Sequence, residues 1–290
     1  MHKFIKDIII FIGVIALILI VFHLFLINNR EEIMKIDDSI NKIYLGNSTV
    51  EQAINDSLLE NGFNFARSAE SIDLIYAKIQ LLKEANPNID TIYVCFDDII
   101  LYKTNIYYDL SSIFFLDKFS TTDYLMNLRE FSFGRNTESI SHLYDISKIK
   151  PMILSYISKV DIRDLNIGGY LWSTRSKLYE DLHRRKKENV KALKFEDFPR
   201  INKYYLNEII SYCKNNGITL FFFITPRYPT EYPDTIYRNI HQAYFKEIPL
   251  LDYSRIQLPD SCFGDCVHLN YKGAKIFTEI LNKGYQFNDQ

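Results

Sequence analysis

The stretch Lys42-Ile43-Tyr44-Leu45-Gly46-Asn47-Ser48 joins a short β-forming run to an abrupt turn. Aromatic and β-branched side chains favour a strand over residues 42–45, and glycine lets the backbone turn sharply where that strand ends. Ser48 would then project at the carboxyl edge of a sheet. Gly-Asn-Ser is also common turn chemistry, so the stretch taken alone is better explained as an ordinary turn.

Outward from this stretch, strand and helix patterns alternate. Further strands are predicted over residues 63–66, 91–96, 218–224 and 250–252. Apolar residues at helical spacing predict helices over 72–82 and 206–213, and a last helix capped by Asn270 and ended by Gly284. This alternation predicts an α/β fold, a three-layer sandwich with a mostly parallel sheet between helices.

The first thirty residues predict a membrane anchor. Residues 8–27 are almost wholly apolar, and a helix of about 20 residues spans the bilayer hydrocarbon. A cleaved signal peptide is the alternative, but this run is longer and lacks a small-x-small site. Lys3 and Lys6 favour an inside N-terminus. We therefore expect a single-pass protein of the cell membrane whose C-terminal domain lies outside the cytoplasm.

Two units follow from these patterns: residues 1–30 as cytoplasmic stub and anchor, and residues 31–290 as one α/β domain. Residues from about 100 to 200 are aromatic and charged, and we interpret them as a largely helical insertion. Aromatic residues over 100–130 suit either a core or a sugar-binding groove. The basic run 183–187 suits a solvated helix face, or a contact with anionic lipid or polysaccharide.

Composition narrows the class of partner. The 290 residues carry a net charge of −2, which gives no reason to expect nucleic acid. Four cysteines are too few for a disulfide framework. Cys262, Cys266 and His268 could ligate a metal, but an outward-facing compartment favours a Cys262–Cys266 disulfide instead.

A nucleophilic serine needs a base, and elimination selects one histidine. Of the six histidines, five lie in or before the anchor, in the insertion, or in segments predicted to be exposed. His268 stands immediately before the last helix, and Asp265, three residues earlier, could orient its ring. Because a parallel sheet gathers ligands at its carboxyl edge, Ser48, Asp265 and His268 are expected to meet there.

These residues resemble the SGNH (GDSL-type) hydrolase family, specifically its membrane-anchored bacterial members, over residues 42–98 and 203–282. Gly46-Asn47-Ser48 stands where that family has its first block, residues 64–71 resemble the second, and Asp265-x-x-His268 resembles the last. Thr225-Pro226 after the fourth strand is also usual in the anchored members. The resemblance implies Ser48 as nucleophile, His268 as base and Asp265 as its orienting acid.

Three positions depart from the family pattern. Asn47 replaces an aspartate of structural role, and Ala69 stands where a glycine amide contributes to the oxyanion hole. Asp97 occupies the third block, where the family has an asparagine that donates to the oxyanion. Ser48, Ala69 and Asp97 are thus the candidate oxyanion or substrate-binding positions. An ionised Asp97 would repel an oxyanion, and loss of one donor costs ~10²–10³ in rate.

The resemblance implies a serine esterase or O-acyltransferase acting on acyl, for example acetyl, esters of an envelope carbohydrate or lipid. No metal or organic cofactor is implied, and envelope proteins are candidate partners. The alternative is a catalytically degenerate binding protein of the same fold in a polysaccharide-modification system. A purely structural anchor is a third hypothesis.

Overall fold

A computed structural model describes residues 31–97, 167–185, 198–229 and 235–284, together with isolated residues outside these ranges. In this part of the chain, five parallel strands form one sheet in the order β2-β1-β3-β4-β5. The strands are β1 (Lys42–Leu45), β2 (Gly62–Asn64), β3 (Thr91–Cys95), β4 (Thr219–Ile224) and β5 (Leu250–Asp252). The predicted α/β fold with a parallel sheet is confirmed.

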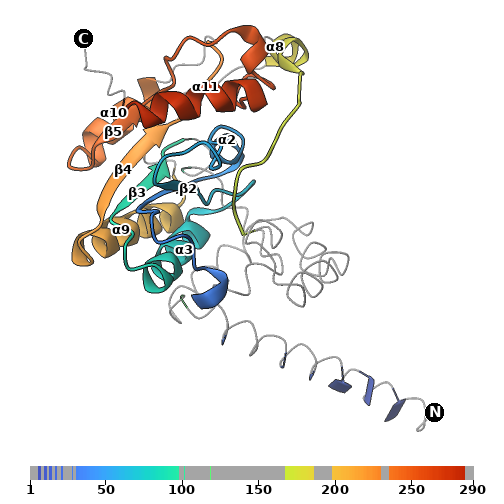
Figure 1. The fold of residues 1–290 in the computed structure, drawn as a ribbon, viewed down its shortest axis with the longest axis vertical. Helices are drawn as coiled ribbons and strands as arrows, with labels where there is room; N and C mark the ends of the chain where they lie inside the picture. The colour runs from blue at the N-terminus through green and yellow to red at the C-terminus, as the bar shows by residue number, and fades with distance from the viewer. Residues whose placement is uncertain are drawn as a thin grey trace.

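Helices cover both faces of this sheet, as Figure 1 shows, with α3 and α9 on one side and α10 and α11 on the other. The two longest, α3 and α9, pack against each other. The described helices are α2 (Ser48–Glu51), α3 (Ile72–Ala85), α8 (Leu178–Arg185), α9 (Arg200–Asn215), α10 (Thr235–Tyr244) and α11 (Tyr271–Asn282), with a 3₁₀ turn η5 (Asp260–Cys262).

The element boundaries agree closely with the sequence patterns. β1 and β5 match the predicted ranges, and β2 ends at Asn64, two residues early, where the Asn64 side chain turns to other partners. Asn270 caps α11 by accepting hydrogen bonds from the amides of Lys272 and Gly273. The sequence patterns did not predict α2, because four residues are too few to show a helical period.

The core is built from apolar strands buried between the two helical layers. Ile43 and Leu45 of β1, Val94 of β3 and Phe222 of β4 are fully buried. Their continuous apolar character is what a parallel sheet covered on both faces requires. At the edge of this core the rings of Tyr44 and Tyr93 stack with centroids 4.4 Å apart.

The strand order fixes where a ligand site lies. The chain passes from β1 to one neighbour and later to the other, so the connections leaving β1 and β3 diverge at their carboxyl ends. A crevice at such a switch point is the usual ligand site of an open α/β sheet. Ser48 follows β1 and Asp97 follows β3, so both stand at this point.

The predicted anchor and most of the predicted insertion lie outside the described residues. Among the described residues, no helix has the length and apolar character needed to cross a membrane. Some apolar side chains of the predicted anchor are described, and these are half or more exposed: Ile10, Phe11, Val14, Leu17 and Val21. Of the insertion, residues 167–185 are described, and they include the helix α8.

Candidate active site

Ser48 is presented by a tight connection between β1 and α2. A Cβ at Gly46 would lie 2.6 Å from Val50 Cγ2 and 2.8 Å from Cys95 Cβ, so a larger residue would push α2 off the sheet. Asn47 caps the helix, its side chain accepting from the Thr49 amide at 2.8 Å. Ser48 is therefore the first helical residue, half-buried at the carboxyl edge of the sheet.

The far end of α2 is fixed by Asn64, the last residue of β2. The fully buried Asn64 Nδ2 donates to the carbonyls of Val50 at 3.1 Å and Ile54 at 2.8 Å, and its Oδ1 accepts from the Ala66 amide at 3.0 Å. These bonds satisfy carbonyls that a helix end leaves without partners. This role of Asn64 could not be predicted, because an asparagine in a short strand has no characteristic sequence pattern.

The loop before α11 carries Asp265 and His268. Asp265 Oδ1 accepts from the amides of Val267 and His268, both at 2.9 Å, which curls the loop into one tight turn. The carboxylate also meets the imidazole, with His268 Nδ1 3.0 Å from each Asp265 oxygen. The sequence spacing Asp-x-x-His thus produces the orienting contact that was predicted for it.

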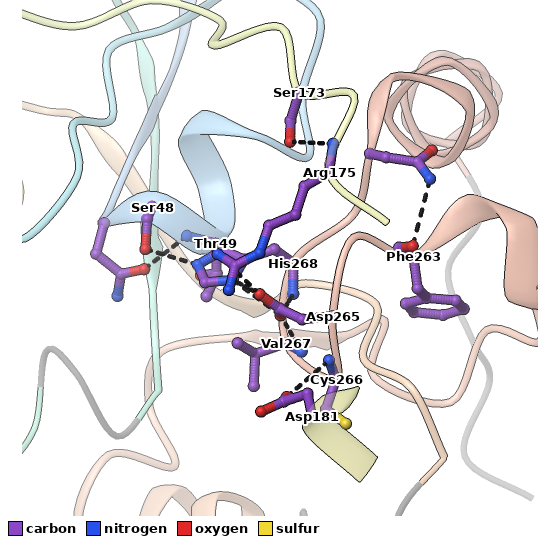
Figure 2. Close-up of polar contacts among 12 residues, drawn as sticks. Ser48, Thr49, Ser173, Arg175, Asp181, Phe263, Asp265, Cys266, Val267 and His268 are labelled. Atoms are coloured by element: carbon purple, nitrogen blue, oxygen red, sulfur yellow. Dashed lines mark hydrogen bonds and ion pairs between the residues drawn. The ribbon is translucent and has the colours of Figure 1, made fainter. Parts of the chain in front are cut away.

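The structure brings together Ser48, His268 and Asp265, whose side chains form a continuous chain of hydrogen bonds in Figure 2. Ser48 Oγ lies 2.8 Å from His268 Nε2, although 220 positions separate the two residues. Burial alone would raise the pKa of Asp265, but hydrogen bonds from the imidazole and from two amides outweigh it and hold that pKa well below its ordinary value. A carboxylate that stays ionised can fix the ring and stabilise an imidazolium.

Asp97 is placed differently from the prediction. Its side chain is fully buried rather than facing a substrate, and it accepts hydrogen bonds from Asn47 Nδ2 at 3.0 Å and Thr49 Oγ1 at 3.1 Å. Arg227 Nη2, which follows β4, lies 3.1 Å from Asp97 Oδ2. The oxyanion-side role expected for Asp97 stays a prediction, and its buried pairing with Arg227 does not support that role. The Arg227 contact could not be inferred from the sequence, because 130 positions separate the two residues.

Ala69 belongs to a loop that lies against the nucleophile helix. The Arg67 amide donates to the Gly46 carbonyl at 3.3 Å, and Ser68 Oγ donates to Glu51. Ala69 itself has a φ of +58°, a conformation that favours glycine, in a turn closed by a hydrogen bond from the Glu70 amide to the Arg67 carbonyl. The alanine thus occupies a glycine-type backbone position beside the site.

Below this loop lies a buried ion pair that the sequence patterns did not indicate. Lys78 Nζ is 2.7 Å from Glu70 Oε2 and donates to the Phe65 carbonyl at 2.9 Å. Burial lowers the pKa of Lys78 to about 8, opposed by the Glu70 carboxylate. The pair ties α3 to the loop that carries Ala69.

The end of the insertion also reaches the site. Arg175 Nη1 lies 3.1 Å from Asp265 Oδ2, and Figure 2 shows its side chain extending toward the Asp265–His268 pair. Asp181 of α8 accepts from the Cys266 amide at 3.2 Å. Sequence reasoning missed both residues, since nothing in the insertion pattern linked them to the strand ends.

The expected Cys262–Cys266 disulfide is not formed: both residues are buried free thiols. Burial raises the pKa of the Cys262 thiol. Their backbones are held by other contacts, Cys262 in η5 and Cys266 by Asp181. Within the described ranges, no group of three or more potential ligands could hold a metal ion.

Comparison with known proteins adds little to this geometry. A protein-family model without a functional description matches residues 177–287, less than half of the chain. No curated protein matches the chain. Among solved structures, a Bacteroides fragilis protein provisionally described as an acylhydrolase is similar at 12% identity and a TM-score of 0.37, over 89% of this chain and 92% of that one. A TM-score this low carries no functional assignment.

Proposed function

We propose that this protein is an SGNH-like serine esterase or O-acyltransferase that acts on an O-acyl ester, for example an acetyl ester, of an envelope carbohydrate or lipid. The observation that carries the proposal is the 2.8 Å contact between Ser48 Oγ and His268 Nε2, continued at 3.0 Å from His268 Nδ1 to Asp265. A hydroxyl, an imidazole and a carboxylate in this order are the parts needed to activate a serine.

In the proposed reaction, Ser48 Oγ attacks the acyl carbonyl carbon while His268 Nε2 takes the hydroxyl proton. The tetrahedral intermediate collapses as His268 returns that proton to the departing alcohol oxygen, leaving the acyl group on Ser48. Water or an acceptor hydroxyl then attacks the acyl carbon, again giving its proton to His268. His268 returns that proton to Ser48 Oγ as the bond between Oγ and the acyl carbon breaks, which restores the free serine. Hydrolysis and transfer differ only in this second nucleophile.

The oxyanion is proposed to be stabilised by the backbone amides of Ser48 and Ala69. Asp97 takes no part, because its carboxylate is turned inward and paired with Arg227. This pairing also reduces the repulsion between Asp97 and an oxyanion, because the Arg227 cation neutralises the carboxylate charge within the protein. A site with two donors in place of three is expected to be slower by about 10²–10³.

We also propose that residues 8–27 anchor the domain in the membrane with the active site outside the cytoplasm. The described side chains of this segment support the proposal because they are large, apolar and exposed, among them Phe11 at 65% and Leu17 at 61%. Such a surface in water would be costly, and lipid is the environment that suits it.

Covalent labelling tests the catalytic proposal. The full-length chain in detergent is incubated with a fluorophosphonate probe, alongside Ser48→Ala and the control Ser57→Ala, which removes an exposed serine outside the site. Labelling of the wild type and of Ser57→Ala, with none in Ser48→Ala, is expected. Labelling that persists in Ser48→Ala would refute Ser48 as the nucleophile.

A non-catalytic binding protein is the second candidate, and the aspartate at position 97 favours it. If neither the wild type nor the variants react with the probe although all remain folded, Ser48, His268 and Asp265 have a structural or binding role and not a catalytic one. Turnover of p-nitrophenyl acetate by the wild type, absent in Ser48→Ala, would decide for the enzyme.

A further inference from the structure

A short extended segment, residues 170–177, bridges the two halves of the candidate active site. Near the start of this segment, the Leu171 amide donates to the Glu51 carbonyl at 2.9 Å. Glu51 is the last residue of α2, the helix that begins with Ser48. Two residues after Leu171, the Ser173 carbonyl accepts from the amide of Tyr271, the first residue of α11, at 2.9 Å. At its end, the Lys177 amide donates to Gly264 at 2.7 Å. We call residues 170–177 the strap.

Trp172 lies between these two anchor points. Leu171 before it is bonded to the helix that begins with Ser48, and Ser173 after it is bonded to a residue only three positions beyond His268. One helical turn of about 5.4 Å separates Glu51 from Ser48. The strap therefore places Trp172 between its contact with α2, which begins with Ser48, and its contact with α11, which follows the loop of His268.

The Trp172 ring is exposed, yet it is held in a fixed orientation. It is 60% exposed, although tryptophan is usually among the more buried residues. One face stacks on Tyr271 with ring centroids 4.6 Å apart and an interplanar angle of 17°, and Tyr170 meets it edge-on at 6.5 Å. In the described part of the chain, no third ring stacks on it. Neither the core nor the catalytic triad accounts for this arrangement.

We propose that the exposed Trp172 ring, supported by Tyr271, is a subsite for a sugar ring of the acylated substrate. The C–H groups on one side of a pyranose are apolar and slightly positive, and they pack well on the negative face of an aromatic ring. This inference rests on the proposed esterase or acyltransferase function, and it selects carbohydrate over lipid as the acyl carrier.

The surroundings of Trp172 suit a sugar better than an alkyl chain. Thr174, Arg175 and Ser176 on the same strap are exposed, and their polar groups can bond to sugar hydroxyls. Arg175 is also tied to Asp265 at 3.1 Å, so the polar rim and the triad share one framework. An alkyl chain gains most from an enclosed apolar channel, whereas a ring stacked on an exposed platform keeps its hydroxyls in water.

Fluorescence gives a direct test, because Trp172 is the only tryptophan in the chain. The full-length Ser48→Ala protein in detergent is titrated with an O-acetylated tetramer of N-acetylglucosamine and, separately, with an O-acetylated tetramer of glucose. A saturable change in emission with at least one of them is expected. No change with either up to millimolar concentration would overturn the subsite, as would a response only to phosphatidylglycerol vesicles, which would indicate a membrane contact.

Kinetics provides the second readout. Trp172→Ala is expected to lower kcat/KM for whichever O-acetylated oligosaccharide binds in the titration. This loss should be about tenfold larger than the loss for p-nitrophenyl acetate, because one aromatic contact typically contributes that much binding free energy. The control Tyr244→Ala removes an aromatic side chain that is 49% exposed on α10, and no change is expected. Equal losses on both substrates would show that the strap merely supports the triad and would overturn the subsite. If Ser48 proves unreactive, the fluorescence titration still shows whether the protein binds the sugar. Failure of the catalytic proposal can therefore be distinguished from failure of the subsite proposal.

Discussion

Asp97→Asn is the substitution that most sharply tests the buried network beside the active site. Asparagine is the residue type at this position in the family that the sequence resembles. From that resemblance alone, the variant would be expected to have a better oxyanion hole. The structure predicts the opposite outcome. Asp97 is fully buried, and its two oxygens accept from Asn47 Nδ2, Thr49 Oγ1 and Arg227 Nη2 at 3.0–3.1 Å.

The size of the effect follows from these contacts. An asparagine keeps one oxygen, but its NH₂ group would face one of the donors now bound by the carboxylate. It also removes the carboxylate charge that lies 3.1 Å from Nη2 of Arg227, whose side chain is only 8% exposed. Breaking a buried ion pair from one side costs ~3–5 kcal/mol, and because the amide oxygen still accepts we expect about 3 kcal/mol.

Urea unfolding of the full-length chain in detergent, followed by tyrosine and tryptophan fluorescence, measures this loss. Asp38→Asn makes the same chemical change at an exposed position and should shift the unfolding free energy by less than about 0.5 kcal/mol. The double variant Asp97→Asn with Arg227→Met should recover part of the stability, since it removes both charges of the buried pair. Unchanged stability and raised esterase activity in Asp97→Asn would refute the reasoning.

Three further predictions concern the site and its support. Ala69→Gly should raise the unfolding free energy by up to about 1 kcal/mol, because the positive φ of +58° strains an alanine more than glycine loses in chain entropy; urea unfolding that shows a loss would contradict this. Asp265→Asn should cost stability above about pH 4 and progressively less below it, since the pKa of Asp265 is depressed in the folded state and its contribution is lost as the pH falls; parallel stability curves from pH 2 to 7 would disprove the assignment. Lys78→Met should lower the unfolding free energy by about 3 kcal/mol at pH 7, because it removes one charged partner of the buried Glu70. Adding Glu70→Gln should restore part of the lost unfolding free energy. A double-mutant cycle in which the two losses simply add would argue against the pair.

Local sequence pattern was sufficient for most of the framework. The β-forming run at 42–45 and the apolar run at 218–224 are short and continuous, so they identify buried parallel strands without knowledge of their neighbours. Asn270 and the helical stripe behind it likewise mark the start of α11. The turn that joins Asp265 to His268 is also local, because the two residues are three positions apart.

Contacts between residues far apart in the sequence could not be predicted from such local patterns. The 2.8 Å approach of Ser48 to His268 was expected only because parallel strands end at one edge, a rule that gives the neighbourhood but not the distance. The inward turn of Asp97 depends on Arg227, 130 positions away, and the strap depends on contacts from Leu171 to Glu51 and from Ser173 to Tyr271.

The amino-acid order alone therefore specified the strands, the last helix and the Asp265–His268 turn, since these depend on neighbours within a few residues. Folding in three dimensions decided that Asp97 is buried as the partner of a cation and that residues 170–177 join α2 to α11. Both outcomes are set by which surfaces of the sheet and its loops meet, and no short stretch of chain contains that information.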